Sequence, residues 1–282
     1  MPWYTKYIEV YEKPLSSVPQ TIIAEVQSKL KERRSEEPLV SVVLIAHNEE
    51  KRLLACLWSL CNNRCDLPIE ILAVNNCSTD GTTEVLNELG VTWFDEKKKG
   101  PGHARQCGLD HAKGAYHICI DADTMYPPLY IQTHVKQLMK PKVACTFSLW
   151  SFIPIEGKSR IGLFFYETLR DIYLGLQSIN RPELCVRGMV FGFKTEYARR
   201  IGFRTDIIRG EDGSLALGMK PYGKLKLITS RKARAITGYG TVGADGSLLQ
   251  SFGKRLIRAV KSISGLFTRK KQYKDEEENL IK

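Results

Sequence analysis

The stretch YHICIDADT, residues Tyr116–Thr124, decides how the rest of the chain is interpreted. A short apolar run that favours a strand leads into Asp121 and Asp123, which are separated by the small residue Ala122. Side chains two residues apart on an extended strand point the same way, so we expect the two carboxylates to converge. Converging carboxylates suit a hard divalent cation that carries phosphate oxygens, whereas the alternative is an ordinary turn, which aspartate also favours.

Upstream of this stretch, apolar runs alternate with helical patterns. The predicted strands are 39–46, 69–74, 91–94 and 116–120, and the predicted helices between them are 49–61, 82–89 and 103–113. We expect Asn48 to cap the first of these helices. This alternation predicts an α/β fold with a mostly parallel sheet, whose ligands lie at the carboxyl ends of the strands. The loops AHNEE, NNCSTDG and DADT follow three such ends, so they are expected to meet at one crevice.

Beyond Pro141 the pattern is less regular. It predicts a strand over 143–150, a long helix over 160–179, a strand and turn over 185–194, a short helix over 195–201, a helix start within 210–223 and a strand over 225–230. The expected organisation is an N-terminal extension (1–38) with a helix over 21–34, a central domain (39–235) and a C-terminal tail (236–282).

Composition restricts the possible partners and the cellular compartment. The chain has 282 residues, and 42 Lys and Arg against 31 Asp and Glu give a net charge of +11, which favours nucleotide phosphates, nucleic acid or an acidic membrane. The eight cysteines are scattered without a C-x-x-C motif, which indicates reduced thiols in the cytoplasm and neither a zinc site nor a disulfide framework. The N-terminus lacks an apolar core of signal-peptide length, and no run of 18 apolar residues predicts a membrane-spanning helix.

Five blocks in sequence carry a resemblance to a known family. They are VSVVLIAHNEE (40–50), EILAVNNCSTDGT (70–82), GPGHARQCGLDHAKGAYHICIDADT (100–124), RGMVFGFKTEYARRIGF (187–203) and GEDGSLALGMKPYGKL (210–225). Over about 39–235 the chain resembles the family 2 glycosyltransferases, inverting enzymes of the GT-A fold. The resemblance implies a Rossmann-like, mostly parallel central sheet with helices on both faces. It also implies transfer of a sugar from a nucleotide-diphosphate sugar to an acceptor hydroxyl.

The resemblance also implies residues that hold the donor. Ala46, Asn48 and Glu49 match the loop that holds the base and ribose in the family. Asn75 stands where the family usually has an aspartate that binds uracil, which leaves UDP and GDP donors both open. Arg105 is expected at the phosphate or at the base and ribose, whereas Lys97 and Lys98 before it are interpreted as a solvated run. Ala122 and Gly188 complete the expected donor side, and Gly188 with Met189 and Val190 is expected to line the sugar and acceptor.

In the same resemblance, the metal and the general base come from separate blocks. Asp121 would meet the ribose or a metal-bound water, and Asp123 would coordinate Mg²⁺ or Mn²⁺ on the diphosphate. No third protein ligand is evident from the sequence. Asp212 matches the general base, with Glu211 beside it as the secondary candidate. The alternative for this pair is a role as capping carboxylates at the start of a helix.

The basic tail predicts a peripheral location. Over Ser247–Phe267 a C-terminal amphipathic helix is expected, with an apolar stripe and a basic face followed by Arg269–Lys271. We interpret it as a contact with an anionic membrane at the inner, cytoplasmic face of the cell membrane, which would fit a polyprenyl, other lipid-linked or glycan acceptor. The alternative is that the stripe packs on the catalytic domain.

Three other classes of protein fit this sequence less well. A nucleotidyltransferase would place a glycine-rich basic loop after the first strand, where this chain has AHNEE. A nucleic-acid-binding module is disfavoured because the basic residues collect in the tail without interleaved aromatic residues. A catalytically inactive nucleotide-sugar or glycan-binding relative is the alternative that remains, because Asn75 departs from the family pattern.

Overall fold

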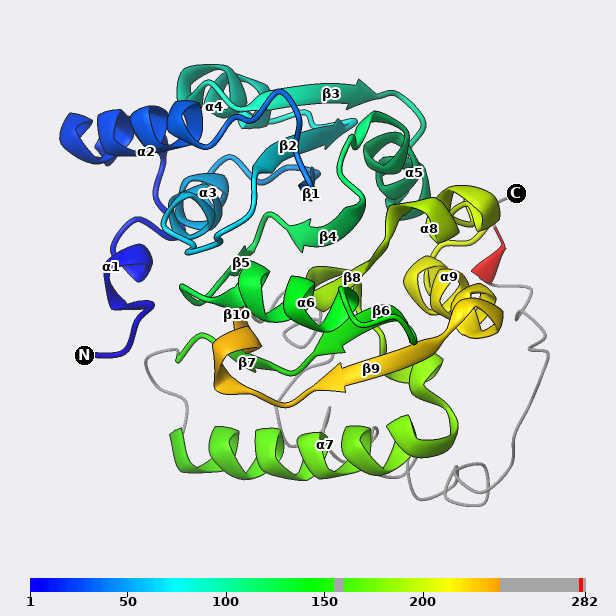
Figure 1. The fold of residues 1–282 in the computed structure, drawn as a ribbon. Helices are drawn as coiled ribbons and strands as arrows, with labels where there is room; N and C mark the ends of the chain where they lie inside the picture. The colour runs from blue at the N-terminus through cyan, green and yellow to red at the C-terminus, as the bar shows by residue number, and fades with distance from the viewer. Residues whose placement is uncertain (155–159, 239–278, 281–282) are drawn as a thin grey trace.

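The computed structural model describes residues 1–154, 160–238 and 279–280, and its centre is a seven-stranded sheet with the order β3-β2-β1-β4-β8-β6-β9 (Figure 1). Its strands are β1 (Val40–Ala46), β2 (Ile69–Asn76), β3 (Thr92–Glu96), β4 (Tyr116–Asp121), β6 (Val143–Ser148), β8 (Phe191–Lys194) and β9 (Lys224–Ile228). Strands β1 to β4 pair in parallel, and β8 pairs antiparallel with both β4 and β6. The prediction of a mostly parallel sheet is therefore confirmed.

Helices lie on both faces of this sheet, as predicted. The helices are α1 (Thr5–Ile8), α2 (Gln20–Glu32), α3 (Leu53–Cys61), α4 (Thr82–Leu89), α5 (Pro101–His111), α6 (Tyr130–Leu138), α7 (Arg160–Asn180), α8 (Thr195–Ile201) and α9 (Glu211–Met219). Alternate residues of β1 face opposite ways, so Val42 belongs to the same apolar cluster as α3, whereas Val43 packs with Ala104 of α5. Both faces of β1 are thus buried, which explains its continuous apolar sequence.

The loop after β1 differs from the prediction. Helix α3 begins at Leu53, four residues later than predicted, and Arg52 is at its N-cap position. Asn48 does not cap it, because its backbone is left-handed, with φ of 59°, and its Oδ1 accepts from the backbone N–H of Thr79 at 2.7 Å. Asparagine tolerates this conformation better than most residues do. Asn48 therefore ties the loop after β1 to the loop after β2.

A second, three-stranded sheet borders the central one. It consists of β5 (Thr124–Met125), β10 (Ala235–Thr237) and β7 (Trp150–Phe152), in the order β5-β10-β7. The short 3-10 helices η1 (Leu15–Ser17), η2 (Pro182–Cys185), η3 (Gly188–Val190), η4 (Lys220–Tyr222) and η5 (Arg231–Ala233) join the remaining elements. Strand β10 carries Thr237 to the turn that follows β4, where it matters for the site.

Both ends of the described chain pack on this body. Tyr7 of α1 and Val26 of α2 are buried in the main apolar cluster, so the N-terminal residues share its core. Leu280 forms an isolated antiparallel bridge with Ile207, in the loop before α9. The predicted amphipathic helix over Ser247–Phe267 lies outside the described residues. No helix among the described residues is long and apolar enough to cross a bilayer.

Candidate active site

The carboxyl ends of β1, β2 and β4 and the start of α9 enclose a cleft of about 330 Å³. Its lining comprises Ile45, Ala46, His47, Glu49, Asn76, Lys99, Gly100, Pro101, Ala104, Arg105, Asp121, Ala122, Asp123, Glu211 and Asp212. Eight of the predicted site residues are in this lining, from four separate stretches of the chain. The convergence of strand-end loops that the sequence predicted is therefore present.

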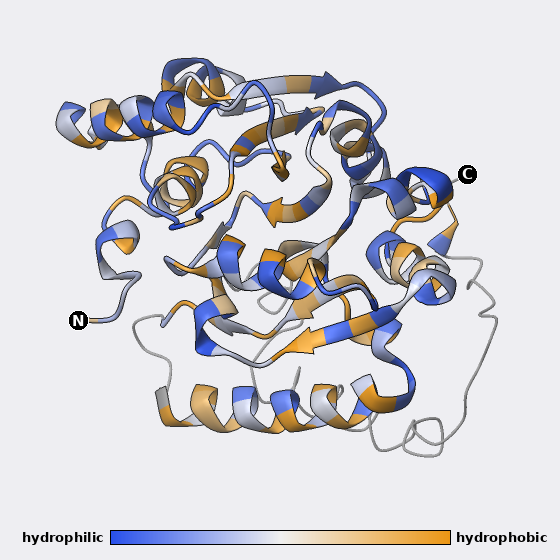
Figure 2. Cartoon of the chain, in the orientation of Figure 1, coloured by the Kyte–Doolittle hydropathy of each residue, from blue (hydrophilic) through white to orange (hydrophobic). Residues whose placement is uncertain are grey.

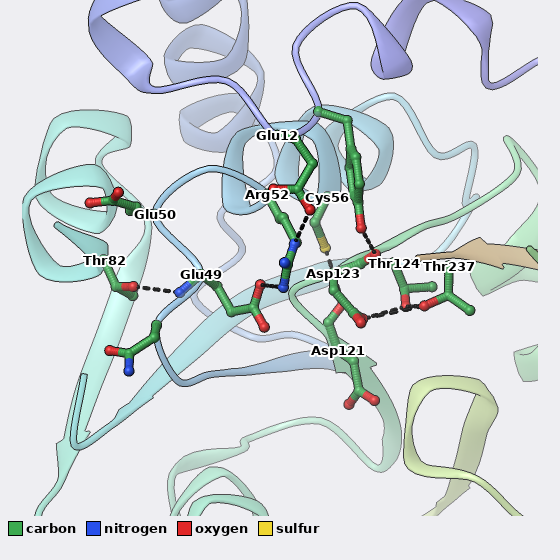
Figure 3. Close-up of polar contacts among 12 residues, drawn as sticks. Glu12, Glu49, Glu50, Arg52, Cys56, Thr82, Asp121, Asp123, Thr124 and Thr237 are labelled. Carbon is green, nitrogen blue, oxygen red and sulfur yellow. Dashed lines mark hydrogen bonds and ion pairs between the residues drawn. The ribbon is translucent and has the colours of Figure 1, made fainter. Parts of the chain in front are cut away.

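The Asp121–Asp123 segment is a turn and not the end of an extended strand. Strand β4 ends at Asp121, and β5 starts at Thr124. In Figure 3 the Asp123 carboxylate points towards Thr124 and Thr237, whereas that of Asp121 points away from them. The expectation that both carboxylates share one face of a strand was therefore wrong. Ala122, which lies between them, lines the cleft with a small side chain, as predicted.

Asp123 is held by hydroxyl groups. Its Oδ1 accepts from the hydroxyl of Thr124 at 2.8 Å and from that of Thr237 at 3.4 Å. Tyr11, from the N-terminal region, donates its hydroxyl to the backbone oxygen of Asp123 at 3.1 Å. Burial, and then the negative charge of Asp121, raise the pKa of Asp123 to about 6. Among the described residues, no ion pair within 4.0 Å involves this carboxylate.

Glu49 adds a third acidic group to this side of the cleft. Its carboxylate pairs with Arg52 at 3.1 Å, and Arg52 pairs in turn with Glu12 at 2.6 Å (Figure 3). Burial, and then the charge of Asp123, raise the pKa of Glu49 to about 7. The backbone N–H of Glu49 donates to the hydroxyl of Thr82 at 2.8 Å, which fixes the loop against α4. The donor side therefore has an excess of negative charge.

Arg105 is buried between the two acidic groups of the cleft. Its guanidinium pairs with Asp121, and its Nε lies 3.6 Å from Asp212 Oδ1. Its Nη1 also donates to the backbone oxygen of Ile120 at 3.0 Å. Only 2% of Arg105 is exposed, although it lines the cleft, and its contact with the donor stays a prediction. Its ion pairs position the carboxylates of β4 and α9 relative to each other.

Asp212 is the second residue of α9, and its side chain is only 13% exposed. Burial, and then the neighbouring Glu211, raise the pKa of Asp212 to about 7, against the lowering effect of Arg105. Gly188 is not in the cleft lining but packs against Arg105 and Asp212. A β-carbon at residue 188 would lie 2.6 Å from Asp212 Oδ2 and still closer to the guanidinium of Arg105. Glycine is thus needed here for the close approach.

Asn75 also lies behind the cleft rather than in its lining. Its amide donates to Thr83 at 3.2 Å and to Asp95 at 3.3 Å, and its Oδ1 is buried without a hydrogen-bond partner. The next residue, Asn76, lines the cleft instead and accepts from the N–H of Gly100 at 2.9 Å. This pattern gives Asn75 a structural position between β2 and β3.

Several cleft residues were not singled out from the sequence. His47 and Lys99 line the cleft, and Tyr11 and Thr237 hold the Asp123 turn. Lys99 follows Lys97 and Lys98, the two lysines interpreted as solvated, and its position directly before Gly-Pro-Gly is a sequence signal that could have identified it. Tyr11 and Thr237 carry no local signal, because they reach Asp123 only through the tertiary fold.

The two aspartates of the turn fit a divalent cation with few protein ligands. Among the described residues, no group of three His, Cys, Asp or Glu could hold a metal. Asp123 has a raised pKa and no ion-pair partner in that part of the chain, so a cation there would relieve the repulsion among Asp123, Asp121 and Glu49. Mg²⁺ ordinarily keeps several waters and binds through one or two carboxylates plus substrate phosphates. The carboxylates present therefore suit a cation that arrives with a diphosphate.

Comparison with known proteins identifies the family. Residues 41–202, more than half of the chain, match the family model described as Glycosyl transferase family 2. The chain belongs to glycosyl transferase family 2. A similar protein is an uncharacterized glycosyltransferase of Haemophilus influenzae, 25% identical over 240 residues that span 80% of this chain and 92% of that protein. The family confirms the resemblance and makes the chain a nucleotide-sugar-dependent glycosyltransferase.

Solved structures show the same GT-A fold. The mannosyltransferase PcManGT from Pyrobaculum calidifontis, in complex with GDP-Man and Mn²⁺, aligns with a TM-score of 0.56 at 20% identity, over 94% of this chain and 80% of that one. Residues 1–349 of S. aureus TarS, in complex with UDP, align with a TM-score of 0.55 at 18% identity, over 71% of this chain and 60% of that one. At these identities the likeness concerns the fold alone.

Proposed function

We propose that this family 2 glycosyltransferase transfers a sugar with inversion from a UDP- or GDP-linked donor to a hydroxyl of a glycan or lipid-linked acceptor. One observation carries the proposal. Asp212 is a buried carboxylate with a pKa of about 7, and it lines the same cleft as the Asp121–Asp123 turn. An inverting transfer needs a general base on the acceptor side and a place for the leaving diphosphate on the other, and these two features provide both.

Asp212 would act as the general base. When the pKa of a base lies near the working pH, a large fraction of the base is ionised, and the ionised form still binds a proton strongly enough to remove it from the acceptor hydroxyl. In its ionised form Asp212 takes the proton of the acceptor hydroxyl as that oxygen attacks the anomeric carbon. Arg105, with Nε 3.6 Å from Asp212 Oδ1, stabilises the ionised form and limits the rise in pKa that burial causes. Glu211 is the secondary candidate for this role.

Asp123, assisted by Asp121, would hold Mg²⁺ or Mn²⁺ on the donor diphosphate. When bound, the cation would supply charge neutralisation for the leaving nucleoside diphosphate. The complex of PcManGT with GDP-Man and Mn²⁺ supports this assignment by analogy of fold. Lys99, His47 and Asn76 line the cleft nearby and are suited to phosphate, ribose or base contacts. Glu49 would face the nucleoside from the loop after β1.

The acceptor and the location are also part of the proposal. A net charge of +11 and the basic residues between 254 and 271 support an enzyme held at the anionic, cytoplasmic face of the cell membrane. A polyprenyl or other lipid-linked acceptor would meet the enzyme there, and a glycan acceptor is the alternative.

The decisive test replaces Asp212 with asparagine. Asp212→Asn keeps the size and removes the basic oxygen, so turnover should fall by about 10²-fold or more while donor affinity is retained. Because the base must be ionised, wild-type kcat should rise with pH, reach half its maximum near pH 7 and level off about one pH unit higher, and the variant should lose this acid limb. The measurement is UDP or GDP release from a panel of nucleotide sugars with Mn²⁺ or Mg²⁺.

Glu211→Gln and Asp110→Asn are the matched comparisons. Asp110 is an exposed carboxylate on α5, so its variant should match the wild type. If Glu211→Gln abolishes turnover and Asp212→Asn does not, the base is Glu211. A wild-type protein that binds nucleotide sugars and never releases the nucleoside diphosphate would instead be the inactive binding relative.

A further inference from the structure

Helix α7 presents an unusual surface to solvent. Seven large apolar side chains along its 21 residues are between 49% and 73% exposed. They are Ile161, Phe164, Phe165, Leu169, Ile172, Leu176 and Ile179. Their spacing places them on one side of an α-helix about 30 Å long, which we call the apolar face of α7. Figure 2 shows apolar residues along the whole of α7, which forms the outermost layer of the molecule in Figure 1.

The polar side of α7 faces inwards. Glu167 accepts from the hydroxyl of Ser151 at 2.8 Å and from the N–H of Phe152 at 2.8 Å. Asp171 pairs with Arg170 at 2.8 Å and with Arg234 at 2.5 Å. These polar contacts, together with the buried Leu163, Leu174 and Gln177, fix the orientation of the helix. The exposure of the apolar face therefore follows from specific anchoring and not from a loose helix.

Such a face is costly in water. Monomeric soluble proteins rarely expose contiguous apolar patches larger than a few hundred Å², and larger patches mark protein or membrane contacts. The apolar face of α7 contains no charged residue: Glu167 binds Ser151 on the inward side, and Asp171, seven residues after Phe164, lies at the edge of the face and is paired with Arg234. A ligand for this face must therefore offer apolar surface along nearly 30 Å.

Exposed cations close in sequence to an ion pair of α7 indicate which class of ligand this face takes. Arg231 and Lys232 of η5 are exposed, and they directly precede Ala233 and Arg234, the residue that pairs with Asp171 of α7. An apolar helical face with cations at its side is the arrangement of helices that lie in the interface of an anionic bilayer. A second copy of this chain is disfavoured as the ligand, because two molecules that each carry a net charge of +11 repel each other.

The face is also close in sequence and space to the acceptor side of the cleft. Residues of η2 follow α7 directly, and Cys185 Sγ lies 3.6 Å from the backbone oxygen of Leu174. Three residues later, Gly188 packs against Arg105 and Asp212. The segment that follows α7 therefore links this helix to the surroundings of Asp212.

We propose that the apolar face of α7 docks in the plane of an anionic membrane surface, with Arg231 and Lys232 at the headgroups. Docked in this way, α7 holds the cleft next to the bilayer and presents it to an acceptor whose hydroxyl lies at the headgroup level. Only this last statement rests on the proposed function. The docking itself is a property of the surface and is independent of catalysis.

The test uses the full chain in sedimentation with vesicles of equimolar phosphatidylcholine and phosphatidylglycerol. Phe164→Gln/Ile172→Gln should lower the vesicle partition coefficient by about tenfold or more, because two large apolar side chains no longer enter the interface. Met139→Gln is the matched control, since Met139 is 52% exposed at the end of α6, and its binding should equal that of the wild type. Arg231→Gln/Lys232→Gln should bind these vesicles more weakly than the wild type. Binding of this variant should also depend less on salt concentration.

Three results would overturn the proposal. The first is a wild-type chain that does not sediment with anionic vesicles. The second is unchanged binding of Phe164→Gln/Ile172→Gln when Lys254→Gln/Arg258→Gln/Lys261→Gln abolishes it, which would assign the membrane contact to the tail alone. The third is a dimer by light scattering that the α7 variant converts to a monomer without loss of vesicle binding. Donor hydrolysis measured on the same samples reports the proposed function separately, and it should be equal in all these variants.

Discussion

The two sides of the cleft stabilise a buried carboxylate in different ways. Asp123 accepts from the hydroxyls of Thr124 and Thr237, whereas Asp212 has the guanidinium of Arg105 at 3.6 Å. Burial is the largest cause of the raised pKa in both, about 6 for Asp123 and about 7 for Asp212. The cost of desolvating the carboxylate is thus offset by neutral hydroxyl donors at Asp123 and by a permanent cation, Arg105, at Asp212.

This difference separates two chemical roles. A carboxylate surrounded by neutral donors and other acids gains from an added divalent cation, which suits the end of the cleft that would hold the diphosphate. A carboxylate beside a fixed guanidinium has its negative charge partly compensated without an added ion, and it can exchange a proton near neutral pH. The following four variants test this contrast, in the order of their expected effects.

Removal of Arg105 should have the largest effect. Arg105→Gln leaves the buried Asp212 and the partly exposed Asp121 without their cation, so the free energy of unfolding should fall by about 3–5 kcal/mol. Since Arg105 lowers the pKa of Asp212, its loss should also move the acid limb of the kcat–pH profile to higher pH. Denaturant unfolding and the pH profile measure the two effects. Arg200→Gln, at an exposed pair with Glu196, should change neither, and an unshifted acid limb in Arg105→Gln would show that Arg105 does not tune the base.

Gly188→Ala tests the Asp212 side alone, because it displaces the Asp212 carboxylate without removing a charge. The new methyl group would meet Asp212 Oδ2 and the guanidinium of Arg105, so both must shift. Turnover should fall by about 10- to 100-fold, since small displacements at reacting groups carry costs of this size, while Mn²⁺-dependent nucleotide binding persists. Gly175→Ala on α7 is the control, because a β-carbon there meets no atom within 4 Å. Equal turnover for both variants would contradict the close approach.

Asn75→Asp tests whether this fold tolerates aspartate, the residue that the family usually has at this position. A carboxylate at 75 would lie against Asp95, which now accepts from the Asn75 amide at 3.3 Å. We expect a loss of about 1–2 kcal/mol in the free energy of unfolding, the scale of a broken, partly buried hydrogen bond replaced by two like charges. The double variant Asn75→Asp/Asp95→Asn should recover most of the lost free energy of unfolding. A stable single variant with tighter binding of uridine nucleotides would instead show that Asn75 reads the base.

Tyr11→Phe should have the smallest effect. It removes the hydroxyl that donates to the backbone oxygen of Asp123 at 3.1 Å. The free energy of unfolding should fall by about 1 kcal/mol, and the Mn²⁺ concentration for half-maximal activity should rise a few-fold. Tyr116→Phe serves as the comparison, and a metal titration under constant donor is the measurement. If the two variants have the same metal requirement, the N-terminal region does not position Asp123.

The sequence predicted one half of the molecule better than the other. Strands such as Val40–Ala46 are buried on both faces, so their apolar runs mark them directly, and the polar loops at their ends indicate the cleft. The Asp121–Asp123 turn was misjudged because a strand and a turn share the same local sequence there. The partners of Arg105 and the contact from Tyr11 depend on residues distant in sequence. For α7, the apolar spacing predicted the helix, but spacing alone does not say whether a stripe faces the core or the solvent.

The antiparallel strand β8 has a consequence for synthesis of the chain. Strands β1 to β4 are continuous in the chain with their helices, so they can assemble as soon as they leave the ribosome. Strand β4 then remains an open edge until Phe191–Lys194 emerges, because its outer partner is β8. The intervening residues include β6 and the apolar α7, so an unpaired edge and an exposed apolar helix coexist in the nascent protein. The interval between translation of β4 and of β8 is therefore when this chain most needs a chaperone.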